Sequence, residues 1–112
     1  MTRDPIDLEH LRRQTMGDEA LLREVLELFV NHTRKLVADM RAADTGQRRV
    51  MSHTLRGAAS GVGAFALAEH AALMEARPKD ETLLEPLELL AEEACAVATE
   101  LYEGGGRAFR RG

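Results

Sequence analysis

Residues 52–64 read SHTLRGAASGVGA, and they carry both a helical pattern and the histidine on which the interpretation of the chain depends. In an α-helix, where each residue turns the chain by about 100°, the apolar residues of this region form one stripe, made up of Met51, Leu55, Ala58 and Val62. His53 lies about 140 to 200° away from that stripe. The pattern therefore predicts a helix that packs one face on a core and displays His53 to solvent.

Gly57 lies one turn after His53 and shares its solvent-facing side with Arg49, Arg56 and Ser60. Glycine inside a helix costs about 1 kcal/mol relative to alanine. On a solvent face, no close packing between helices requires it. We therefore interpret Gly57 as clearance that lets another molecule approach the imidazole, with close helix packing as the alternative.

The composition predicts a single helical domain. Hydrophobic residues make up 45% and charged residues 30% of the 112 residues, which is typical of a soluble globular protein. Aromatic residues make up only 4%, and β-branched residues are few, so helices are favoured over strands. The net charge of -4 gives no reason to expect nucleic acid as a partner.

Two further features bear on the cellular compartment. The single cysteine, Cys95, excludes an internal disulfide and fits a reducing environment. No apolar run approaches the roughly 18 residues of a membrane span, and the amino terminus does not resemble a signal peptide. We therefore expect a cytoplasmic protein with no membrane contact.

Capping residues and apolar periodicity predict five helices. They are a short helix capped by Asp7, a long helix over residues 18–43 followed by a turn with Gly46, the His53 helix ending at Gly63, a helix over residues 64–77, and a last helix over residues 80–103. Pro86 fits the last helix only if that helix begins near Thr82 or Leu83.

The short links between these helices imply an all-α fold. It is expected to be an antiparallel up-and-down four-helix bundle with the short additional N-terminal helix at one end. Residues 1–103 are assigned to this single domain, and residues 104–112 to a flexible Gly/Arg-rich tail.

The turn expected at residues 63–64 brings Glu75 level with His53, because helices on either side of a tight turn both rise about 1.5 Å per residue. A carboxylate there can accept the imidazole N–H, fix the tautomer and leave the other ring nitrogen as a nucleophile. Glu75 could instead be a solvated charge, or pair with Arg77 or Arg49.

Arg56, three residues after His53, can bind a phosphoryl group or an acidic partner, or can be an ordinary surface cation. The other histidines, His10, His32 and His70, are expected on surfaces or at helix flanks, and Cys95 in the core. No histidines or carboxylates have metal-ligand spacing, so neither a metal nor a cofactor is expected.

The residues around His53 resemble the signature of a known family. His53, Arg56 and Gly57, at positions i, i+3 and i+4, and Gly63, ten residues after the histidine, resemble the signature of histidine-containing phosphotransfer (HPt) domains of two-component phosphorelays. Residues 22–43 resemble the preceding helix of that family, and residues 73–75 resemble part of the following one. The resemblance therefore spans nearly the whole chain.

The resemblance implies that His53 is the phosphoacceptor, that Arg56 takes the place of the usual lysine and that Gly57 is the clearance glycine. Glu75 stands where relatives have Gln or Glu, and in this it resembles the phosphotransfer module of chemotaxis kinases. That module is phosphorylated by a separate ATP-binding domain, for which these 112 residues leave no room. Because no glycine-rich nucleotide motif is present either, we expect a phosphocarrier without ATP binding and not an enzyme.

The implied partners are receiver domains of response regulators, with a hybrid sensor histidine kinase as a further candidate, and the chain is expected to be a monomer. The predicted partner face surrounds His53 on the second and third of the five helices. It contains small positions at Ala59 and Ser60 and a basic rim of Arg48, Arg49 and Arg56. The alternative is a helical adaptor that binds a receiver or kinase on the same face and is never phosphorylated.

Overall fold

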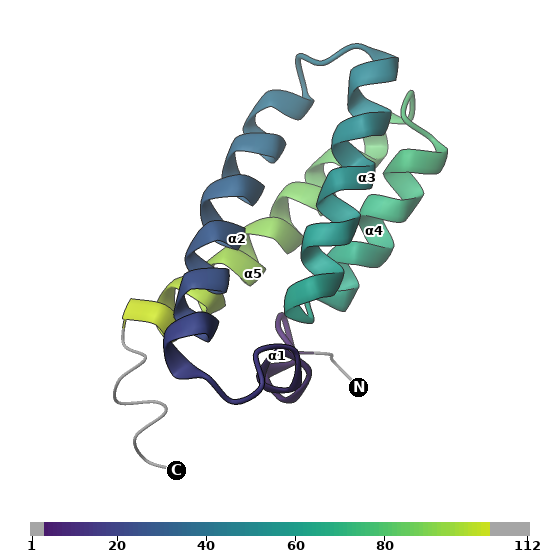
Figure 1. Cartoon of the computed structure of the whole chain (residues 1–112). Coiled ribbons are helices and arrows are strands. Elements are labelled where there is room, and N and C mark those ends of the chain that lie inside the picture. Colours follow the sequence, from purple (N-terminus) through teal and green to yellow (C-terminus); the bar gives the residue numbers. More distant parts are fainter. Residues whose placement is uncertain (1–3, 104–112) are drawn as a thin grey trace.

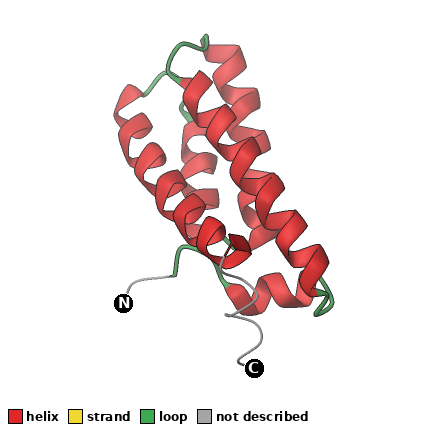
Figure 2. Ribbon diagram, turned by 90° about the vertical axis from the view of Figure 1, so that its left-hand side faces the viewer, coloured by secondary structure: helices red, strands yellow, loops and turns green. Residues whose placement is uncertain are grey.

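The computed structural model describes residues 4–103, and within this range all regular structure is helical (Figures 1 and 2). The elements are α1 (Leu8–Gln14), α2 (Glu19–Met40), α3 (Thr45–Val62), α4 (Phe65–Ala76), a short 3-10 helix η1 (Glu81–Leu83) and α5 (Leu84–Glu103). The four longer helices lie side by side, and α1 lies across one end of them (Figure 1). The predicted all-α class is confirmed, while the predicted tail at residues 104–112 lies outside the described residues.

Local capping fixes the ends of several helices where the sequence predicted them. The Asp7 carboxylate accepts a backbone N–H in the first turn of α1, and Asp18 does the same for α2. Gly63 ends α3 with φ of 81°, a left-handed conformation that glycine adopts without strain. Asp44 and Gln47 form a reciprocal capping box at the start of α3, which the sequence analysis had not identified.

Two predicted boundaries are wrong by a few residues. Helix α2 ends at Met40, three residues early, and Gly46 lies in the first turn of α3, because the Asp44 capping box starts that helix earlier than expected. At the last helix, η1 precedes α5, so Pro86 is the third residue of α5. The missing N–H of Pro86 is tolerated there because the first four N–H groups of an α-helix have no partner within it.

The buried hydrophobic side chains form one cluster, and the most extensive helix contacts are those of α3 with α4 and of α2 with α5. The buried side of α3 differs from the predicted stripe, because Met51 and Ala58 are only half-buried. Its fully buried positions are instead Ser52, Leu55, Ala59 and Val62. The buried side of α3 is rotated around the helix axis relative to the predicted stripe because α3 packs mainly on α4. The periodicity of α3 alone does not reveal which helix it packs against.

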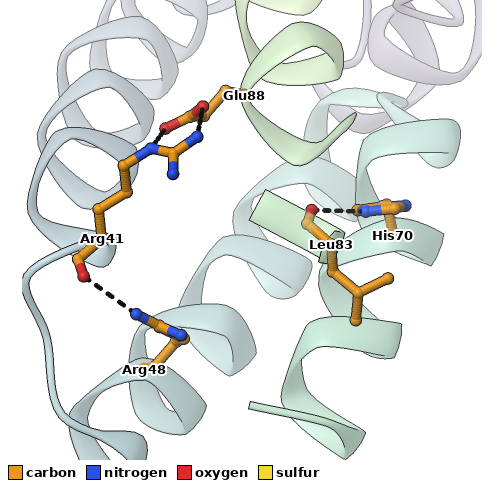
Figure 3. A network of polar contacts seen from close by, with 5 residues as sticks. All are labelled: Arg41, Arg48, His70, Leu83 and Glu88. Carbon is orange, nitrogen blue, oxygen red and sulfur yellow. Dashed lines mark hydrogen bonds and ion pairs between the residues drawn. The ribbon is translucent and has the colours of Figure 1, made fainter. Parts of the chain in front are cut away.

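Arg48, predicted on the basic rim, is buried, with 7% of its surface exposed. Its guanidinium donates hydrogen bonds to the backbone carbonyls of Met40, Arg41 and Pro78, at 3.1, 3.0 and 3.1 Å. Figure 3 shows the bond to Arg41. The last carbonyls of α2 have no partner within their helix, so a buried cation that donates to two carbonyls there satisfies them. Arg48 thus ties α2, α3 and the segment after α4 together.

Other polar groups also link the elements. His70 Nε2 lies 2.9 Å from the Leu83 carbonyl, and so joins α4 to η1 (Figure 3). The His10 ring meets Phe65 edge-on, with centroids 5.0 Å apart. Both histidines are half-buried, where exposed or flanking positions were expected. Cys95 is buried as predicted, and that burial raises the pKa of its thiol. None of the described helices is long and apolar enough to cross a membrane.

Candidate functional site

The site is centred on His53, whose side chain projects from the middle of α3 with 63% of its surface exposed. Its Nδ1 lies 2.9 Å from Glu75 Oε2 on α4, so the predicted position of Glu75 is confirmed. In a neutral ring, Nδ1 must carry the proton because a carboxylate oxygen only accepts. Nε2 then has the free lone pair, and no hydrogen bond within residues 4–103 occupies it.

Arg56 also contacts Glu75, with 3.2 Å between Arg56 Nη1 and Glu75 Oε1. The contact is an ion pair by distance, although Oε1 is buried and accepts no well-aligned hydrogen bond from the described residues. The alternative pairing of Glu75 with Arg77 or Arg49 is not formed. One carboxylate thus faces both the histidine and the arginine.

Gly57 is exposed one turn beyond His53, as predicted. A Cβ atom built on Gly57 would have no atom of another helix within 4 Å, and the same is true of Gly61. Close helix packing therefore does not explain either glycine. Both line an apolar groove between α1, α2 and α3, to which α2 contributes Leu21, Val25, Leu28, Phe29 and His32.

The predicted partner face needs one further correction besides Arg48. Ala59 is completely buried, because it lies four residues after Leu55 and so on the same buried side of α3. Ser60 and Arg49 are exposed as expected. The exposed surface around His53 on α3 therefore includes Arg49, Arg56, Gly57 and Ser60.

The sequence analysis missed three exposed apolar residues near this surface. Leu21 and Leu28 on α2 and Val50 on α3 expose 36%, 64% and 66% of their surface. Leu21 and Leu28 are seven residues apart, so they share one side of α2 that the core does not cover. The seven-residue spacing of two leucines outside the main apolar stripe of α2 was the sequence signal for this exposed apolar side.

Comparisons with protein-family models, curated proteins and solved structures found no match. Within the described residues, no group of three or more histidine, cysteine or carboxylate side chains could hold a metal ion. The interpretation of the site therefore depends on its residue pattern and its geometry.

Proposed function

We propose that this chain is a histidine phosphotransfer protein that relays a phosphoryl group between aspartates of receiver domains through phosphohistidine at His53. The observation that carries the proposal is the contact of His53 Nδ1 with Glu75 on an exposed helix face, which leaves Nε2 open to solvent. The side-by-side packing of α2 to α5 supports the corresponding architecture, an antiparallel up-and-down four-helix bundle with α1 at one end.

In the proposed reaction, the Nε2 lone pair attacks the phosphorus of an aspartyl phosphate in line with the bond that breaks. A P–N bond forms as the P–O bond breaks, and the electron pair leaves with the aspartate carboxylate. The ring keeps its proton on Nδ1 and becomes a cation, which the Glu75 carboxylate stabilises. Attack on phosphohistidine by the carboxylate of a second receiver reverses these steps.

Phosphoryl transfer of this kind depends on positioning and on neutralising charge at the phosphoryl oxygens. Arg56 lies on the His53 side of α3 and contacts the same Glu75 carboxylate, so we assign that role to Arg56. The rest of the charge stabilisation, including any metal ion, would come from the receiver. The chain is therefore proposed to be a carrier without turnover of its own.

The apolar groove beside Gly57 suits the proposed docking of a receiver on α2 and α3. Leu21, Val25 and Leu28 offer apolar surface, and the absent side chain of Gly57 keeps the approach to His53 open. Apolar surface surrounded by charged residues is typical of protein interaction sites.

The test is to mix a receiver domain precharged with labelled phosphate with the wild-type chain, with His53→Gln and with His70→Gln. His70 lies on α4 outside the apolar groove, and glutamine at position 70 keeps a donor for the Leu83 carbonyl, so this variant serves as the matched control. Acid-labile, base-stable label is expected on the wild type and on His70→Gln, but not on His53→Gln. Absence of label with several receivers, despite normal folding and binding, would favour the adaptor that is never phosphorylated.

A further inference from the structure

A second groove lies on the other side of α3 from the apolar one, between the start of α3 and the segment that follows α4. In Figure 1 this segment folds back beside the first turns of α3. The charged side chains that line the groove are Arg49, Arg77, Lys79 and Asp80. Three cations and one carboxylate thus give it a net positive charge, although the whole chain carries -4.

The three cations have no carboxylate partner within residues 4–103. Several other surface cations are paired, for example Lys35 with Asp39 at 3.0 Å and Arg41 with Glu88 at 2.7 Å. The single carboxylate of the groove, Asp80, accepts hydrogen bonds from the hydroxyl and the backbone N–H of Thr82. These bonds, and to a lesser extent the charge of Arg77, lower the pKa of Asp80. The Asp80 carboxylate is therefore ionised at neutral pH and is already bonded to Thr82.

The backbone of the groove is held in place by buried contacts. The Arg48 guanidinium donates to the Pro78 carbonyl, and Pro78 itself is buried. The Asp80 N–H donates to the Arg77 carbonyl at 3.0 Å. Because the segment carrying Arg77 and Lys79 is already fixed, little backbone entropy would be lost when a partner binds.

The groove also adjoins the proposed phosphoacceptor. Arg49 precedes His53 by four residues, so the two side chains lie on the same side of α3 about one turn apart. On α4, Ala76 lines the groove and directly follows Glu75. A protein that covers His53 could therefore reach the groove at the same time.

We propose that this basic groove binds an acidic segment of a partner protein. The groove is a contact separate from the apolar one, and it would select partners that present several carboxylates beside the surface that meets His53. The statement that these carboxylates lie beside the surface that meets His53 rests on the proposed function, whereas the binding of an acidic segment does not.

An acidic segment fits the groove better than a small phosphate does. Small anions are typically held by converging backbone N–H groups. Here the Gln47 N–H at the start of α3 already donates to Asp44. The cations are instead exposed on long side chains around an open groove, an arrangement that attracts an extended charged surface.

The experiment is a nuclear magnetic resonance titration of the full ¹⁵N-labelled chain with a blocked hexaglutamate peptide at low salt. Saturable shifts are expected at the amides of Arg49, Arg77 and Lys79. The double variant Arg77→Gln/Lys79→Gln should weaken binding by at least about fivefold. The control Arg13→Gln/Arg34→Gln removes the same amount of charge from exposed ion pairs on α1 and α2 and should bind the peptide like the wild type.

Three results would overturn the proposal: no saturable shift, equal weakening in both double variants, or binding of inorganic phosphate at these residues without binding of the peptide. The titration requires no phosphorylation. If the chain binds the peptide but takes no label on His53, only the proposed function is refuted. If the chain takes label on His53 but does not bind the peptide, only the proposed binding at the groove is refuted.

Discussion

Glu75 contacts His53 with one carboxylate oxygen and approaches Arg56 with the other, so this one side chain determines which ring nitrogen of His53 is free. Replacing Glu75 with alanine removes the acceptor at Nδ1, and the neutral ring should shift towards the tautomer protonated at Nε2. Glu75→Gln keeps an oxygen acceptor and should largely preserve the wild-type tautomer. Ring ¹⁵N shifts of His53 measure the populations. Identical tautomers in the wild type and Glu75→Ala would show that the contact does not orient the ring.

Gly57 provides a test that separates stability from function. Because a Cβ at position 57 meets no atom of another helix within 4 Å, Gly57→Ala should stabilise the chain by roughly 0.5 to 1 kcal/mol through helix propensity and lost freedom of the unfolded chain. Gly61→Ala, equally open but two turns from His53, is the matched control. Urea unfolding measures both stabilities.

Both substitutions should therefore raise the free energy of unfolding, but Gly57→Ala, which lies nearer to His53, should slow phosphoryl transfer from a receiver much more than Gly61→Ala does. A clear loss of stability in Gly57→Ala would mean that the helix needs glycine for packing after all. Equal slowing by both substitutions would mean that clearance at Gly57 is not special.

At the scale of elements, Arg48 joins two helices and the segment after α4. Arg48→Met should lower the free energy of unfolding by at least about 2 kcal/mol, because buried carbonyls lose a charged donor. Arg49→Met, at the exposed neighbouring position, should stay within about 0.5 kcal/mol of the wild type. Urea unfolding of the two variants measures the difference, and similar values would contradict a structural role for Arg48.

Arg48 also illustrates what the sequence could and could not predict. The caps at Asp7, Asp18 and Gly63 were predicted because they depend on residues within one turn. The level of Glu75 beside His53 was predicted because two helices joined by a tight turn have the same rise per residue. These features follow from local geometry.

The errors arose where a neighbouring element decides the outcome. Arg48 was expected at the surface because the sequence around it does not show the carbonyls that bind it. Those carbonyls come from α2 and from the segment after α4. Ala59 was expected to be exposed because the predicted stripe continues from Leu55 to Ala58. The packing of α3 on α4 instead buries Ala59, which lies four residues after Leu55. The basic groove was missed because Arg77 and Lys79 reach Arg49 only when their segment folds back.

At the scale of the whole molecule, α2 and α5 lie far apart in the sequence and pack extensively against each other. Two exposed ion pairs bridge them: Arg41 with Glu88, through two hydrogen bonds of 2.8 and 2.7 Å, and Arg34 with Glu92, at 3.8 Å. The hydrogen bonds from Arg41 lower the pKa of Glu88 below its ordinary value. The folded chain thus binds the Glu88 proton less tightly than the unfolded chain does.

This difference gives the stability a predictable pH dependence. A carboxyl with a lowered folded-state pKa stabilises the fold above its unfolded-state pKa, and this contribution is lost as the pH falls through the folded-state value. Glu88→Gln should therefore lower Tm slightly at pH 7, and this difference should shrink as the pH falls through the folded-state pKa of Glu88. The effect at pH 7 should be a few degrees at most and should shrink in salt, because exposed pairs are screened.

Glu93→Gln, an exposed glutamate of α5 without an ion pair in the described residues, should show no such pH dependence. A Tm difference for Glu88→Gln that does not shrink as the pH is lowered would mean that α5 depends on Glu88 through packing and not through its charge.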